Sequence, residues 1–330
     1  MSSNKLPNKI LIIGNGFDLD LGLKSSYSHF VSSDKWTNLF VSYPEYREKY
    51  CLAKHLYEAS QIKNWFDLEL ELYKYVKEQI DDNKTYGLKF KYAESDKKEF
   101  ELICSLLKSY LKEESRNFKL NSLSVASTVI NSIVESKMFY AIYSFNYTDL
   151  GGIIHTSLNV DEETPSIIHV HGSLLENDDI ILGVESTDEM MPEEYSYLYK
   201  TSSPYYRSNN MYNALQDADE VVFFGHSING MDFDYFKDFF RIQSDATDMH
   251  YRRKRITIFT GDVQSSTQIK YNFRKSGINV IDLFRLNDIE FVHTLDIEEK
   301  NNNFEQKKLD NFLKRIKKES EDYYINKRLF

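Results

Sequence analysis

Six short runs of β-branched and aromatic residues recur along this chain of 330 residues, and each run ends at small or polar residues. Near-continuous apolarity over so few residues is typical of strands covered on both faces, as in a parallel sheet between layers of helices. Segments with a helical period separate several of the runs, an alternation typical of a doubly wound α/β fold. The runs are Lys9–Ile13, Met138–Ser144, Ser166–Val170, Val221–Phe224, Ile256–Thr260 and Ile278–Leu283.

The runs are unevenly spaced, because more than a hundred residues with helical periodicity separate the first from the second. We predict that residues 27–135 form a helical insertion after the first strand. Residues 1–26 and 136–330 would then form a Rossmann-like nucleotide-binding domain with a mostly parallel sheet. The apolar residues at helical spacing are Trp65, Leu68, Leu72 and Val76, then Leu102, Leu106 and Tyr110, then Leu123, Ala126, Ile130 and Ile133, and near the C-terminus Leu309, Phe312, Leu313 and Ile316.

Charge and cysteine content exclude several classes of partner. The formal net charge of −10 disfavours nucleic acid, because binding its backbone depends on Lys and Arg. The basic run Arg252–Arg255 is interpreted as a solvated loop before a strand. No apolar run is long enough to span a bilayer, and the N-terminus lacks the layout of a signal peptide. Cys51 and Cys104 lie far apart without metal-like spacing, so we expect a cytoplasmic protein that binds no metal.

Open α/β sheets bind ligands at the carboxyl ends of their strands. The first run is followed by Gly14-Asn15-Gly16-Phe17-Asp18, in which two glycines permit a tight turn whose backbone N–H groups approach a phosphate. A plain strand-to-helix turn explains the same pattern, and Leu19 stands where a dinucleotide fingerprint has its third glycine. The fourth run is followed by Gly225-His226-Ser227, which we interpret as a phosphate or ribose cradle because Asn229 breaks the serine-hydrolase elbow.

Polar residues also follow the other runs. Asp149 and Asp262 are candidates for a ligand contact or for a helix cap. Strand alternation would place His169 and His171 on one side, although no third metal ligand accompanies them. His171, at a strand tip beside Gly172, is the better candidate for proton transfer and is expected to carry no core packing. The segment Tyr195–Tyr212 is interpreted as aromatic packing rather than as a lid.

Taken together and in this order, the motifs resemble the AbiH family of bacterial abortive-infection proteins. The resemblance runs from residue 10 to about residue 235, and its combination of motifs is specific. It implies a role in antiphage defence. The matching motifs are Ile12–Asp18 with Gly22–Tyr27, Trp65–Glu69, Ser144–Asp149, His169–Ser173 and Phe224–Asp232.

More distantly, the order Gly-x-Gly, Asn, His-Gly and Gly-x-Ser is similar to sirtuins and to the sirtuin-like NAD-cleaving domains of antiphage systems. This resemblance implies that Asn146 and His171 act at the nicotinamide ribose, while Gly14, Gly16, Gly225 and Ser227 hold NAD. The chain has only two cysteines and so lacks the four-cysteine zinc module of deacetylases, which disfavours deacetylation. We expect the neighbouring Asn15, Phe17, Asp18, Asp149, His226 and Asp262 to contribute to the same nucleotide site.

Three hypotheses follow. The first is an NAD glycohydrolase used in phage defence, in which an amide orients a hydroxyl or water and a histidine takes the proton. The second is a nucleotide-binding sensor without turnover. The third, a serine or metal hydrolase, is disfavoured by the broken elbow and the missing metal ligands. A phage-derived trigger and a homo-oligomer are the partners that we expect besides the nucleotide.

Overall fold

The computed structural model describes residues 8–48, 51–62, 67–86, 90–158, 165–185, 190–207, 209–300 and 302–328. The chain divides into two compact units. Unit 1 comprises Met1–Leu23, Lys119–Val170 and Ser208–Phe330, and unit 2 comprises Lys24–Phe118 and His171–Arg207. These bounds differ from the predicted insertion, since residues 119–135 belong to unit 1 and residues 171–207 to unit 2.

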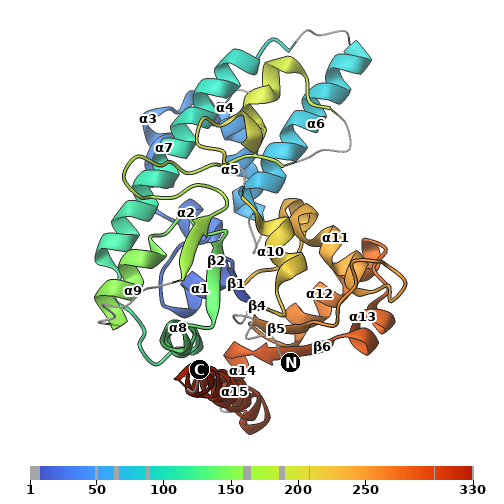
Figure 1. Ribbon diagram of the computed structural model, residues 1–330. Coiled ribbons are helices and arrows are strands. Elements are labelled where there is room, and N and C mark those ends of the chain that lie inside the picture. Colours follow the sequence, from blue (N-terminus) through green and yellow to red (C-terminus); the bar gives the residue numbers. More distant parts are fainter. Residues whose placement is uncertain are drawn as a thin grey trace. The chain divides into compact units, whose positions relative to one another are not determined.

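Unit 1 is built on a six-stranded, all-parallel sheet with the strand order β3-β2-β1-β4-β5-β6 (Figure 1). This is the strand order of the Rossmann fold, which confirms the predicted α/β class. Five of the six apolar runs coincide with strands to within one residue at each end. The strands are β1 (Lys9–Ile13), β2 (Phe139–Ser144), β3 (Ser166–His169), β4 (Glu220–Phe224), β5 (Arg255–Thr260) and β6 (Asp288–His293).

The prediction of a strand at Ile278–Leu283 is wrong. This run lies largely in helix α13 (Val280–Leu286), where the Asn279 side chain caps the first turn by accepting a hydrogen bond of 3.2 Å from the Asp282 amide. The sixth strand is instead β6, at the edge of the sheet. Its first half is largely exposed and carries acidic residues, so it lacks the continuous apolar run of a central strand.

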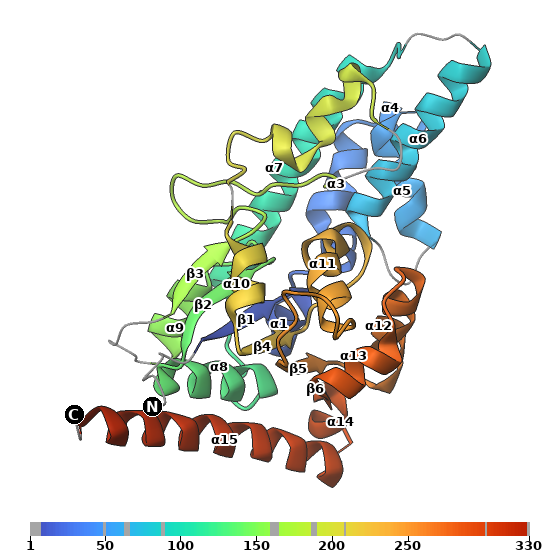
Figure 2. The same cartoon turned by 45° about the vertical axis from the view of Figure 1, so that its right-hand side comes forward.

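Helices cover both faces of the sheet. On one face Ile10, Ile12 and Phe223 pack with aromatic residues of α11 (Asp234–Gln243) and α12 (Val263–Lys275). The opposite face packs against α8 (Val125–Ser136) and α15 (Asn303–Arg328), which run side by side (Figure 2). The remaining helices of unit 1 are α1 (Asn15–Asp20), α9 (Leu150–Leu158), α10 (Met211–Asp217), η3 (Gly230–Phe233) and α14 (Thr294–Glu298).

The predicted inward faces of α8 and α15 are largely confirmed. Leu309, Phe312 and Ile316 are buried, and the Phe312 ring meets Phe259 of β5 edge-on at 5.1 Å. Leu123 is the exception: it is 90% exposed, because α8 begins only after the Ser124 cap.

An ionic cluster closes the amino end of the sheet. Glu220 of β4 is buried, accepts two hydrogen bonds from the Arg315 guanidinium, at 2.6 and 2.8 Å, and one from Lys9. These bonds and charges lower the pKa of Glu220, although its burial opposes the shift. The basic run beside the cluster is only in part the solvated loop that we predicted: it precedes β5 and its Arg252 and Arg253 are exposed, but Lys254 is not. Lys254 is buried and donates to the carbonyl oxygens of Gln216 and Ala218 at the end of α10.

Unit 2 is mainly helical. Its core includes Leu72 and Val76 of α6 (Leu68–Tyr86), and Ile103, Leu107 and Tyr110 of α7 (Ala93–Asn117), whereas the predicted Leu102 and Leu106 are half-buried. Trp65 and Phe66 lie outside the described residues. The helices of unit 2 are α2 (Tyr27–Val31), α3 (Asp34–Ser42), α4 (Glu45–Glu48), α5 (Leu52–Ile62), α6 (Leu68–Tyr86), α7 (Ala93–Asn117), η1 (Glu193–Leu198) and η2 (Lys200–Ser202).

Tyr195 opens the tyrosine-rich segment and is fully buried in unit 2. Its hydroxyl donates a 2.6 Å hydrogen bond to the buried Asp96, as expected of aromatic packing. None of the helices within the described ranges combines the length and apolarity that a membrane crossing demands.

Candidate functional site

The strand order of unit 1 reverses between β1 and β4. From β1 the sheet extends through β2 to β3 on one side, and from β4 through β5 to β6 on the other. In doubly wound folds, the loops that leave the carboxyl ends of two such strands diverge and leave a crevice for a ligand. The loops here begin at Gly14 and Gly225, so both glycine motifs of the sequence lie at this switch point.

The glycines let the two loops meet backbone to backbone. The Gly14 amide donates to the carbonyl oxygen of Phe224 at 3.0 Å, and the Gly16 amide donates to that of Gly225 at 2.9 Å. A Cβ on Gly16 would lie 2.7 Å from the Gly225 Cα, and Gly225 itself has φ +63°. Glycine is therefore required at these positions because the two turns approach each other so closely. These two amide protons are used within the protein.

Asn146 follows β2 and is held at the same edge of the sheet. Its Nδ2 donates to the Gly14 carbonyl oxygen at 3.0 Å and to Oδ1 of Asp18 at 2.7 Å. Oδ2 of Asp18 accepts a 2.8 Å hydrogen bond from the Thr148 hydroxyl. Asn146, Asp18 and Thr148 are each at least 95% buried. The predicted Asn146 and Asp18 thus belong to one hydrogen-bonded group with the turn after β1.

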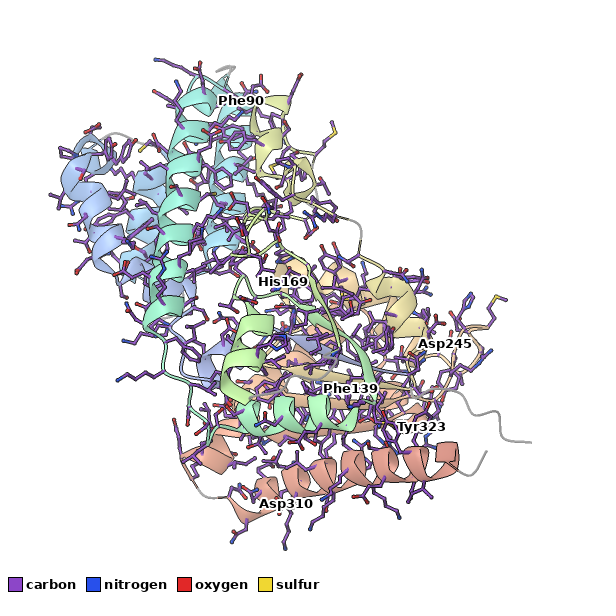
Figure 3. All side chains as sticks on the ribbon, turned by 60° about the vertical axis from the view of Figure 1, so that its left-hand side comes forward. Phe90, Phe139, His169, Asp245, Asp310 and Tyr323 are labelled. Carbon is purple, nitrogen blue, oxygen red and sulfur yellow. The ribbon has the colours of Figure 1, made fainter. Side chains whose placement is uncertain are left out.

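His169 ends β3 and contacts the same segment, with Nδ1 3.1 Å from the Asn146 carbonyl oxygen. Figure 3 labels His169 at the carboxyl end of β3 and Phe139 at the amino end of the paired β2. The strand ends at His169. Strand alternation was expected to place His171 on the same side as His169, but it does not extend to His171.

His226 follows Gly225 and is buried. Its Nδ1 accepts a 2.9 Å hydrogen bond from the Ile228 amide, so in the neutral ring the proton resides on Nε2, which lies 3.9 Å from Oδ2 of Asp232. The Phe145 ring packs edge-on against the imidazole at 4.5 Å. Ser227 is exposed.

The other predicted ligand contacts have structural roles in unit 1. Asp149 accepts a 2.8 Å hydrogen bond from the Gly152 amide in the first turn of α9. Asp262 caps α12 through the Ser265 amide and hydroxyl, and these bonds lower the pKa of its carboxyl group. Phe17 is fully buried against Phe224, whereas Asn15 is half-buried.

His171 belongs to unit 2 and lies in a buried ionic cluster. Nζ of Lys200, which has no exposed surface, lies 3.3 Å from Nδ1 and 3.2 Å from Nε2 of His171. Oε1 of Glu185 lies 3.3 Å from the His171 Nε2, and Oε2 of Glu69 lies 3.1 Å from the Lys200 Nζ. An ammonium only donates and a carboxylate only accepts, so a neutral His171 satisfies both with its proton on Nε2.

This environment corrects one expectation about His171. The residue is 4% exposed and pairs with two charged side chains, so it does carry packing. The prediction that His171 acts on the same ligand as Asn146 stays a prediction.

Sequence reasoning missed Thr148, Asp232, Glu69, Glu185 and Lys200. Thr148, Asp232 and Glu69 lie inside the quoted motifs, and their positions in those motifs could have identified them as candidate site residues. Glu185 lies in a segment without a motif, and Lys200 lies in the tyrosine-rich segment that was interpreted as aromatic packing. An isolated charged residue is ordinarily solvated, and nothing local indicated their burial.

Comparison with known proteins gives one result. The model of the family described as "Bacteriophage abortive infection AbiH" matches residues 10–251. Searches of curated proteins and of solved structures found no match. The matched region contains β1 except Lys9, β2 to β4, both glycine turns, and the residues described above as partners of Asn146 and of His171. The chain therefore belongs to the AbiH family of bacteriophage abortive-infection proteins.

Proposed function

We propose that this abortive-infection protein binds NAD or a closely related nucleotide at the β1/β4 switch point and hydrolyses its nicotinamide–ribose bond. The observation that carries the proposal is the Rossmann strand order, with the two glycine turns meeting at the point where that order reverses. Fold alone does not establish function, so the site residues must supply the chemistry.

In the proposed reaction, water attacks C1′ of the nicotinamide ribose and the C1′–N bond breaks. The bonding electrons leave with nicotinamide, which departs as a neutral base because its ring was cationic. ADP-ribose is the other product, and a proton is released from the attacking water. Asn146 would orient the water, His171 would accept its proton, and the exposed Ser227 would contact ribose or phosphate.

A nucleotide sensor without turnover is the second candidate. The observation that favours it is the position of the Lys200 ammonium, within 3.3 Å of both ring nitrogens of His171. Because Oε1 of Glu185 also lies 3.3 Å from Nε2, both ring nitrogens already have partners within the protein, whereas a general base needs a nitrogen within reach of the attacking water. Binding would then be the whole activity, and the helical unit would meet a partner.

The test uses purified protein with NAD, measuring free nicotinamide and ADP-ribose beside calorimetric titration. Glycohydrolysis predicts both products in equal amounts. Asn146→Ala and His171→Ala should abolish turnover and retain NAD binding, while the exposed His250→Ala serves as the control. Binding without products supports the sensor, and absence of both binding and products refutes both candidates.

A further inference from the structure

The orientation of the Asn146 side-chain amide is determined by its two partners. Nδ2 donates to a backbone carbonyl oxygen, that of Gly14, and to a carboxyl oxygen of Asp18. Turning the amide over would bring Oδ1 against both of these acceptors and lose two hydrogen bonds. The nitrogen therefore faces the protein, and Oδ1 is the remaining polar atom of the side chain.

Both hydrogen bonds of the Asn146 side chain are donated by Nδ2, and no residue in the described ranges donates to Oδ1. Oδ1 is not one of the fully buried atoms without a partner, so it still reaches solvent although the residue as a whole is only 5% exposed. Such groups in folded proteins usually have a protein or water partner. Oδ1 is an acceptor, so its missing partner must be a donor. A hydroxyl group or a water molecule meets this requirement, whereas a carbonyl or phosphate oxygen does not.

We propose that Asp18 is a positioning residue, which fixes Asn146 so that its amide oxygen accepts a hydrogen bond from a water or from a ligand hydroxyl. The ligand class is thereby restricted to molecules that bring a hydroxyl, such as a ribose, or that leave a water at this position. The assignment of the hydroxyl to NAD rests on the proposed function. The positioning of Asn146 by Asp18 does not.

Three substitutions test the functions of the Asp18 oxygens. Asp18→Leu, of similar size, removes both acceptors, so the Asn146 Nδ2 loses its bond to this residue. Asp18→Asn is the conservative variant: its oxygen can still accept from Asn146 while its NH₂ donates to the Thr148 hydroxyl, which can also accept. Thr148→Val removes only the donor to Oδ2 and leaves the carboxylate facing Asn146, so its effect should be smaller.

The first measurement needs no nucleotide. In the NMR spectrum of the free protein, the side-chain NH₂ of Asn146, assigned by its loss in Asn146→Asp, should exchange with solvent at least about tenfold more slowly than that of the exposed Asn229. Asp18→Leu should remove this protection, whereas Asp18→Asn and Thr148→Val should largely keep it. Equal exchange at Asn146 and Asn229 in the native protein, or full protection in a folded Asp18→Leu variant, overturns the positioning role.

The second measurement uses NAD. Asp18→Leu should lower kcat by about 10²-fold, because a misplaced orienting group loses that much, while KM and the calorimetric Kd change little. A lowered kcat without the change in NH₂ exchange would contradict positioning. If the native protein binds no NAD but the exchange results hold, the proposed function fails and the positioning of Asn146 stands. A thermal melt establishes that each variant is folded.

Discussion

The amide of Gly16 donates a 2.9 Å hydrogen bond to the carbonyl oxygen of Gly225, and this bond joins the two loops at the switch point of the sheet. Both residues were expected to matter because a ligand phosphate approaches them. The structure requires glycine at both positions for a different reason: the two turns contact each other, and the space between them holds no side chain.

Gly16→Ala should therefore destabilise the fold as well as weaken binding. The new Cβ would lie 2.7 Å from the Gly225 Cα, against backbone that cannot swing away, and the expected loss of unfolding free energy is about 1–3 kcal/mol. Urea denaturation measures it. The matched control is Gly151→Ala in α9, where the nearest atom to a new Cβ is 3.4 Å away and little or no loss is expected. Similar midpoints for Gly16→Ala and the native protein would contradict the packing argument.

Lys200→Met should be strongly destabilising. It removes the cation beside Glu69 and Glu185 and leaves buried carboxylates uncompensated, which costs about 3–5 kcal/mol. The control is Lys98→Met, which breaks an exposed pair with Glu94 one helical turn away and should cost less than about 0.5 kcal/mol. Both are measured by chemical denaturation. If the two variants lost the same stability, the buried cluster would not be an important anchor of unit 2.

Asp20 should make stability fall as pH rises towards neutrality. Burial raises the pKa of its carboxyl group from 3.8 to about 7, although Oδ2 accepts a hydrogen bond from the Ala126 amide at the start of α8. The folded state thus holds this proton more tightly than the unfolded chain does. The contribution is complete below pH 3.8 and is lost as pH rises to 7.

Asp20→Asn keeps an oxygen for Ala126 and removes the charge. At pH 8 it should raise the free energy of unfolding by about 1–2 kcal/mol, a value reduced from the full shift because Asp20 is only partly buried. Near pH 4 it should have little effect. Denaturation curves at the two pH values check this, and an equal gain at both would show that the Asp20 proton is not responsible.

Asp262→Ala should cost about 1 kcal/mol through loss of the α12 cap. Asp262→Ser should restore most of this stability, because a serine hydroxyl can cap the helix. The lowered pKa of Asp262 means that the carboxylate stabilises the fold above its unfolded pKa and that this contribution is lost as pH falls. Calorimetry with NAD tests the ribose contact predicted from the sequence: a weaker Kd in the folded Asp262→Ser variant would support it.

Strands with two covered faces could be predicted from the sequence because their burial makes each run apolar throughout. Edge strand β6 could not, since Asp288 and Glu290 face outward and interrupt the pattern. Ile278–Leu283 resembled a strand in composition, and only the cap by Asn279 marked it as a helix. For the site, Asn146 and the glycines follow strands and were found by position. Lys200 contacts Glu69 across 131 positions of sequence, and no local pattern encodes such a contact.

The bond between Glu220 and Arg315 has a consequence for the order in which the protein is made. Glu220 lies in the centre of the sheet, but the guanidinium that accompanies it is 95 residues further along the chain. During translation, β1 to β4 are therefore synthesised well before Arg315, whose guanidinium pairs with Glu220 in the folded protein. A nascent sheet in which Lys9 is the available partner of Glu220 lacks part of its electrostatic stabilisation. The amino end of the sheet should thus reach its full rigidity late, when α15 has docked.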